Sequence, residues 1–151
     1  MDTKLLEKLQ YNKANRFLQE TDDMLFQHRW DLAANRYYYA CYHMVQALFV
    51  TRHIITKTHS GALTEFGKNF VLTGFVDRKF SRFLAHMVQL RIKADYNSVA
   101  EVSEDEVKEM APLAHEFVNN LLPLSFLKGY FYKLVFIISW VLLCASTLYV
   151  S

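Results

Sequence analysis

The stretch that decides the fold is residues 33–49, AANRYYYACYHMVQALF. It contains no Gly or Pro, so nothing in it interrupts a helix. Its apolar residues cover one broad arc of such a helix, formed by Tyr37, Tyr38, Tyr42, Val45, Leu48 and Phe49. A helix that is apolar over most of its surface lies at the centre of a bundle, or is partly buried by a second copy of the chain. We therefore predict a central helix over about residues 31–55, with Asp31 as its N-cap.

Arg36 and His43 lie on the narrower strip of this helix, together with the small residues Ala40 and Ala47. Seven residues are two helical turns, so Arg36 and His43 lie within about 20° of each other and about 10.5 Å apart along the axis. The small residues would allow another helix to approach closely. One long Arg side chain would have to bend for both groups to meet one phosphate. A two-fold pairing of the helix with its twin would instead bring four such groups together.

These two residues allow two interpretations. In the first, Arg36 is a surface residue whose stem packs on the aromatics, and His43 is a hydrogen-bonded core histidine. In the second, they form a site, because Arg suits phosphate and His suits proton transfer near neutral pH. An Arg is costly to bury without a partner, which favours the second interpretation.

The rest of the chain predicts further helices around this one. Apolar residues recur at three- and four-residue steps over about residues 2–28, 63–72, 76–96 and from 103 to near 123. Ser103 followed by Glu106 is a capping box, Asp2 or Thr3 can cap the first helix, and Gly74 can end the third. The predicted fold is all-α, an antiparallel up-and-down bundle of four to five helices in one domain over residues 1–124.

Composition and charge bound the function. The net charge of +2 is too small to indicate a nucleic-acid-binding surface by itself. The two Cys lie far apart and no His, Cys, Asp and Glu cluster has metal-ligand spacing, so we predict no metal, no cofactor and a reducing compartment. The N-terminus is charged and amphipathic, unlike a signal peptide.

Residues 125–151 form a hydrophobic tail that differs from the rest. From Tyr130 about 21 residues are largely apolar, with only Lys133 charged, and a bilayer core needs roughly 20. Lys128 and Lys133 precede the apolar run, as in a cytoplasmic domain with a C-terminal anchor. Three interpretations stay open: a membrane anchor, an extra hydrophobic core helix, or a non-native end. The predicted location is cytoplasmic, with or without a tether.

Three pieces of the sequence resemble one family. NRYYYACYHMVQALF, then THSG, then LRIKADY occur in this order and at suitable spacing. Together they resemble the HEPN family (higher eukaryotes and prokaryotes nucleotide-binding), whose members carry an Arg followed by a His on a central helix. The resemblance covers about residues 5–122. It implies an antiparallel helical bundle that forms a homodimer through the helix carrying Arg36 and His43.

The resemblance also implies a function. Many members are metal-independent endoribonucleases, often toxins encoded beside a nucleotidyltransferase antitoxin. Carried over to this chain, Arg36 would bind the scissile phosphate, and His43 would act as base on the ribose 2′-OH or as acid on the leaving 5′-oxygen. The products of RNA cleavage would be a 2′,3′-cyclic phosphate and a 5′-OH. This chemistry needs no metal, because the nucleophile is already in the RNA.

Asn35, Tyr39 and His59 are the predicted substrate-binding residues. Tyr39 lies between Arg36 and His43 on the same side and could stack a base, although core packing also accounts for it. His59 falls where the family pattern places a His at a helix entry, although a hydrogen bond to its own backbone also accounts for it.

The sequence departs from the family pattern at two positions, and each departure bears on the predicted function. Tyr37 stands where many active members have a polar residue, which leaves a non-catalytic binding module for a transferase or nucleotide as the second interpretation. Val45 stands where one branch of the family has a Tyr that is AMPylated, so that modification does not carry over. A membrane-tethered interaction protein is the third interpretation. Arg91 and Asp95, four residues apart, are predicted to form a structural ion pair.

Overall fold

The computed structural model describes residues 2–96 and 101–121. The predicted tail, residues 125–151, lies outside the described residues. Within the described ranges, none of the helices combines the length and the apolar character that a membrane span requires.

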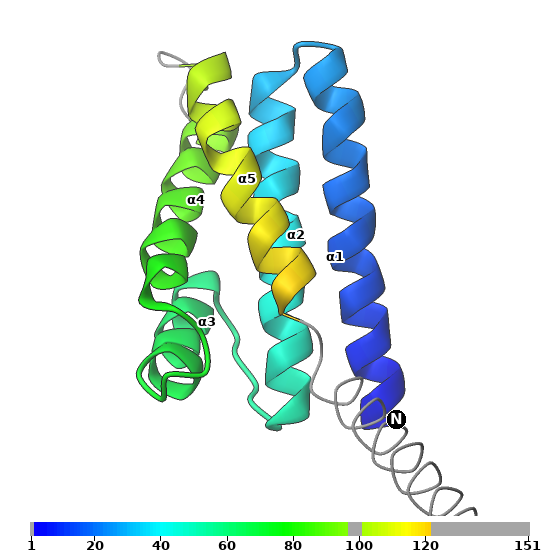
Figure 1. Cartoon of the computed structure of the whole chain (residues 1–151), viewed down its shortest axis with the longest axis vertical. Coiled ribbons are helices and arrows are strands. Elements are labelled where there is room, and N and C mark those ends of the chain that lie inside the picture. Colours follow the sequence, from blue (N-terminus) through cyan, green and yellow to red (C-terminus); the bar gives the residue numbers. More distant parts are fainter. Residues whose placement is uncertain (1, 97–100, 122–151) are drawn as a thin grey trace, which may run out of the picture.

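The described part of the chain is all-helical, as predicted. Its elements are α1 (Thr3–Phe26), α2 (Trp30–Thr51), α3 (His59–Phe66), the π-helical turn η1 (Gly67–Val71), α4 (Arg78–Tyr96) and α5 (Glu104–Asn120). Helix α2 lies between α1 and α4, and α5 crosses it on a third side (Figure 1). Its buried residues are Ala33, Ala34, Tyr37, Tyr38, Ala40, Cys41, Met44, Val45, Ala47, Leu48 and Phe49. The prediction that this stretch is the central helix of a bundle is therefore confirmed.

Helices α1 and α2 form an antiparallel hairpin (Figure 1). A three-residue turn joins them, in which His28 adopts a left-handed φ of 57°. The Arg29 N–H donates to the Met24 carbonyl at 2.9 Å, and the His28 N–H donates to the Leu25 carbonyl at 3.1 Å. The turn thus satisfies carbonyls at the end of α1 while it reverses the chain.

Three predicted helix boundaries are wrong. Helix α2 starts at Trp30 with Arg29 as N-cap, so Asp31 lies inside the first turn, where its carboxylate accepts a hydrogen bond from the Val102 N–H instead. The helix ends at Thr51 rather than near 55, because the chain turns at His53 with a φ of 55°.

The third helix begins at His59, earlier than predicted. The Thr58 side chain accepts the Gly61 N–H at 3.0 Å and so supplies an N-cap that was not predicted. The helix then continues through η1, and Gly74 provides the left-handed residue, with φ 74°, a short way after it.

The first turns of α1 are less buried than its apolar pattern predicts. Leu5 and Leu9 are 49% and 43% exposed, whereas Ala14 and Leu18 further along the helix are buried. No described helix covers that side of α1 near its N-terminus. The N-cap itself is as predicted, since the Asp2 carboxylate accepts the Lys4 N–H at 3.0 Å.

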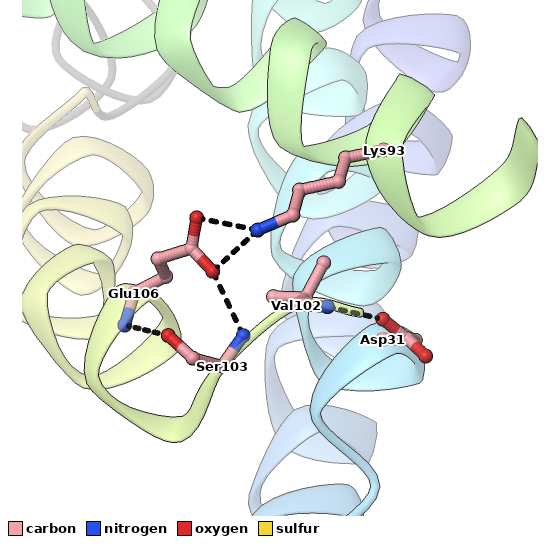
Figure 2. Close-up of polar contacts among 5 residues, drawn as sticks. All are labelled: Asp31, Lys93, Val102, Ser103 and Glu106. Atoms are coloured by element: carbon pink, nitrogen blue, oxygen red, sulfur yellow. Dashed lines mark hydrogen bonds and ion pairs between the residues drawn. The ribbon is translucent and has the colours of Figure 1, made fainter. Parts of the chain in front are cut away.

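The start of α5 is tied to two other helices (Figure 2). The predicted capping box is present: Ser103 Oγ accepts the Glu106 N–H at 3.3 Å, and Glu106 Oε2 accepts the Ser103 N–H at 2.8 Å. Glu106 also accepts from Lys93 Nζ of α4 at 2.8 Å, and Asp31 of α2 accepts the Val102 N–H at 3.0 Å. One short segment therefore anchors α5 to both α2 and α4.

We expect Ser103→Ala to lower the free energy of unfolding by about 1 kcal/mol, because it leaves an N-terminal N–H of α5 without its acceptor. Urea denaturation followed by circular dichroism measures the change. Lys108→Ala is the matched control, since it removes only the exposed Lys108–Glu104 pair on the same helix. A loss from Ser103→Ala no greater than that of the control would contradict a stabilising cap.

Candidate functional site

One side of α2 is only half-buried, and it carries the candidate residues. This open face consists of Asn35, Arg36, Tyr39, Tyr42, His43 and Gln46. Tyr37 points the other way, with its ring 6.0 Å from that of His115 on α5. Tyr39 is two residues on, about 200° around the helix, so the open face lies away from α5. It is bordered by α1 on one side and by α3 and α4 on the other.

Phe17 of α1 is the common neighbour of three candidates. The Arg36 guanidinium carbon lies 5.4 Å from the Phe17 ring centroid, and the His43 ring stacks on Phe17 at 5.4 Å with an interplanar angle of 3°. The Tyr39 ring stacks on it at 5.7 Å. The structure thus brings Arg36, Tyr39 and His43 together around one aromatic side chain, with the guanidinium and the imidazole both against its ring.

Arg36 is held by a carboxylate. Its Nε lies 3.0 Å from Glu20 Oε2, and its side chain is 32% exposed. The contact is an ion pair rather than a well-aligned hydrogen bond, since Arg36 Nε is buried and has no hydrogen-bond partner. Glu20 also pairs with Arg16, whose Nε lies 3.5 Å from Oε1. A phosphate that bound Arg36 would compete with this carboxylate for the guanidinium.

His43 is positioned by a side chain of α1. Its Nδ1 lies 2.7 Å from Gln10 Oε1. Burial, together with the positive charges of Lys13 and Arg16, lowers the pKa of His43 to about 4. At neutral pH the imidazole is therefore uncharged. A neutral imidazole can accept a proton from a hydroxyl group, as a general base does.

His59 joins the same face from the start of α3. The Tyr38 hydroxyl and His59 Nδ1 form a hydrogen bond. The His59 ring lies 4.5 Å from the Tyr42 ring and 6.5 Å from the Tyr39 ring. Burial, together with the charge of Arg91, lowers the pKa of His59. The hydrogen bond that the structure shows for His59 thus joins it to a side chain of α2.

Asn35 is engaged in a structural contact. Its Nδ2 donates to Asp95 Oδ1 at 2.9 Å, and Asp95 Oδ2 lies 3.1 Å from Arg91 Nε. The predicted Arg91–Asp95 pair is thus confirmed. The guanidinium carbon of Arg91 lies 5.5 Å from the Tyr38 ring centroid and 5.8 Å from that of Tyr39. Asn35 and Asp95 therefore hold Arg91 against the aromatic part of the face.

Residues of α1 that were not predicted complete the site. Gln10, Phe17 and Glu20 are not among the predicted site residues. A signal was present: residues 10, 13, 17 and 20 are spaced as 36, 39, 43 and 46 are. In an antiparallel hairpin two such rows lie side by side in opposite order. Glu20 accordingly contacts Arg36 and Phe17 contacts Tyr39. Gln10 lies opposite residue 46 in this order, and its side chain reaches His43, one step along the row.

No three His, Cys, Asp or Glu side chains come together as a potential metal site in residues 2–96 and 101–121. The chemistry that this face offers is carried by a guanidinium, two imidazoles and several phenol rings.

The fold and the face define a class of protein, an all-helical bundle whose central helix presents an Arg and a His two turns apart on its open side. A family model described as the HEPN domain matches residues 8–123. The chain therefore belongs to the HEPN family.

Relatives among curated proteins support the same membership. The chain is 31% identical over 128 residues to "Putative toxin MJ0142" of Methanocaldococcus jannaschii, which covers 82% of this chain and 86% of that protein. It is 32% identical over 109 residues to a UPF0332 protein of Thermotoga maritima, and the match covers 72% of this chain and 83% of that protein. "Putative toxin MJ0605" of Methanocaldococcus jannaschii is 33% identical over 89 residues, and the match covers 59% of this chain and 66% of that protein.

We expect the stability of the protein to depend on the protonation of His43. Its folded pKa of about 4 lies below the usual 6.5, so between these values the unfolded chain binds a proton that the folded chain excludes. Stability should fall as the pH drops from about 6.5 to about 4. Half-burial limits this contribution to about 2 kcal/mol, at about 1.4 kcal/mol per pKa unit.

Urea denaturation at pH 7 and at pH 4.5 measures the effect. The loss on acidification should be smaller in His43→Gln than in wild type, and unchanged in His86→Gln, which alters an exposed histidine of α4. Equal losses in wild type and His43→Gln would contradict the lowered pKa.

Proposed function

We propose that this protein is a toxin-like HEPN ribonuclease that cleaves RNA without a metal ion. The observation that carries the proposal is the pairing of Arg36 with a neutral His43 on the open face of α2. Family membership supports it, as do the names of two relatives, each called a putative toxin. RNA is the proposed substrate, and a nucleotidyltransferase antitoxin is the proposed partner.

The proposed reaction is a transesterification within the RNA. His43 Nε2 accepts the proton of the ribose 2′-OH, and the 2′-oxygen bonds to phosphorus as the bond from phosphorus to the 5′-oxygen breaks. The imidazolium then returns its proton to the departing 5′-oxygen. Arg36 stabilises the charge on the phosphate oxygens. The products are a 2′,3′-cyclic phosphate and a 5′-OH.

A homodimer is part of the proposal. Phe17 lies against both Arg36 and His43, and these two groups are about two helical turns apart along α2. Ala40 and Ala47 are fully buried within the single chain, so the close helix contact that they permit is made by the chain's own helices. A second copy would therefore pack on the half-buried open face and bring its own Arg36 and His43 to the same RNA.

The direct test is cleavage of RNA in the presence of EDTA. Purified wild-type protein should cut, and its products should carry 2′,3′-cyclic phosphate ends. Arg36→Ala and His43→Ala should each lower kcat/KM by about 100-fold or more, because one variant loses the phosphate contact and the other loses the base.

Arg78→Ala is the control for the loss of a positive charge at a distance from the face, since Arg78 is an exposed residue at the start of α4. Absence of cleavage by the wild type across single-stranded and structured RNAs would refute the ribonuclease. The non-catalytic module would then take its place, and the closed Arg36–Glu20 and Asn35–Asp95 contacts favour that alternative.

We also expect Glu20→Gln to lower the KM for RNA about two- to tenfold, because the neutral amide no longer competes with phosphate for Arg36. Steady-state kinetics at two salt concentrations measure it. Glu65→Gln is the control, since Glu65 lies on α3 and bonds to Asn69. A higher KM in Glu20→Gln would show that the carboxylate orients Arg36 rather than competes for it.

A further inference from the structure

We infer that Gln10 is a positioning residue that fixes the tautomer of His43, with the proton on Nδ1 and the lone pair on Nε2. The use of that lone pair in RNA cleavage rests on the proposed function. The tautomer itself is a property of the folded protein and can be measured without any substrate.

The hydrogen bond determines which nitrogen carries the proton. Gln10 Oε1 is a carbonyl oxygen, which only accepts, and it lies 2.7 Å from His43 Nδ1. The nitrogen that faces it must therefore donate. A neutral imidazole has one N–H, so Nε2 is left as the acceptor. Hydrogen bonds of this kind to one ring nitrogen set the role of the other.

Two side chains of α1 together fix the ring. Phe17 stacks parallel to the His43 imidazole and so sets its plane. The bond to Gln10 sets the rotation of the ring within that plane, since it links one particular ring atom to α1. Gln10 and Phe17 lie two turns apart on α1 and are both half-buried. Plane and rotation together set the direction of Nε2.

Gln10 is an uncharged hydrogen-bond acceptor, which suits a histidine that must stay uncharged at neutral pH. The charges that lower the pKa of His43 are the positive Lys13 and Arg16 on α1, whereas Arg36 on its own helix is paired with the negative Glu20. Tyr39 and Tyr42 border it on α2, and His59 of α3 lies beyond Tyr42. A carboxylate at position 10 would stabilise the imidazolium and raise the pKa of His43. Gln10 orients the ring without that effect.

Long-range 1H–15N NMR spectra of the full chain test the tautomer directly. At pH 7 the His43 signals, identified by their absence in His43→Gln, should show Nδ1 as the protonated nitrogen and Nε2 as the bare one. In Gln10→Leu this preference should be lost. Gln10→Glu keeps an acceptor of similar size, so it should retain the tautomer and raise the pKa of His43 by one unit or more.

Gln46→Leu is the matched control. Gln46 lies three residues after His43 on the same face, and its amide nitrogen is buried without a hydrogen-bond partner. Its replacement should leave the His43 signals unchanged. A wild-type spectrum with the proton on Nε2 would overturn the inference, because the Gln10 amide would then donate to Nδ1. An unchanged tautomer in Gln10→Leu would overturn it as well.

Kinetics separate this inference from the proposed function. In an active enzyme, Gln10→Leu should lower kcat/KM about 10- to 100-fold, as misplacement of a catalytic group does. Gln10→Glu should move the acidic limb of the pH profile of kcat/KM upward by one unit or more. The Nδ1–H tautomer in a protein that cuts no RNA would support the role of Gln10 and refute the ribonuclease. Cleavage with an unaltered pH profile in Gln10→Glu would refute the role of Gln10 alone.

Discussion

The packing of α1 against α2 around Phe17 is the contact on which the site depends. Helix α2 is too apolar to remain in water, yet it carries an Arg and a His that resist full burial. One aromatic ring from α1 accommodates both requirements, because it covers part of each group and both side chains remain half-buried rather than fully buried. Arg36 lies against it through cation–π contact and His43 through parallel stacking.

Several polar groups on or beside the open face have a partner from a neighbouring element. Glu20 neutralises Arg36, Gln10 orients His43, the Tyr38 hydroxyl bonds to His59, and Asp95 joins Asn35 to Arg91. This pairing is what makes the half-burial of so many polar side chains tolerable. Anything that binds the face must therefore replace some of these contacts with better ones, and a phosphate is a strong competitor for a guanidinium.

Much of the fold was predictable from the sequence because it follows from local patterns. The central helix and the capping box depend on residues within one or two turns of each other, and the periodicity shows them. Asp31 was misassigned because a carboxylate near a helix start is expected to cap its own helix. The Asp31 carboxylate instead accepts a hydrogen bond from the Val102 N–H, which is far away in sequence. Thr58 was not predicted as a cap because the apolar periodicity of that helix begins only near residue 63.

The candidate site was only half predictable for the same reason. Arg36 and His43 stand out because they interrupt an apolar helix, and the family pattern selects them. Their partners on α1 are ordinary polar residues on a surface helix, and no local rule separates Gln10 or Glu20 from their neighbours. They gain a role only when the hairpin places them opposite α2, so their identification requires the pairing of the two helices.

Because of that pairing, the turn between the helices determines the register of α1 against α2. The three residues between Phe26 and Trp30, with His28 in a left-handed conformation, set which residue of α1 lies opposite which residue of α2. One helical turn of slippage is about 5.4 Å, which would take Glu20 away from Arg36 and Gln10 away from His43 at the same time. Turns are usually the part of a fold that tolerates insertions. Here the geometry of the site depends on the length of the turn. An insertion or deletion in the turn, far from the open face, would misalign all of the contacts between α1 and α2 in the site.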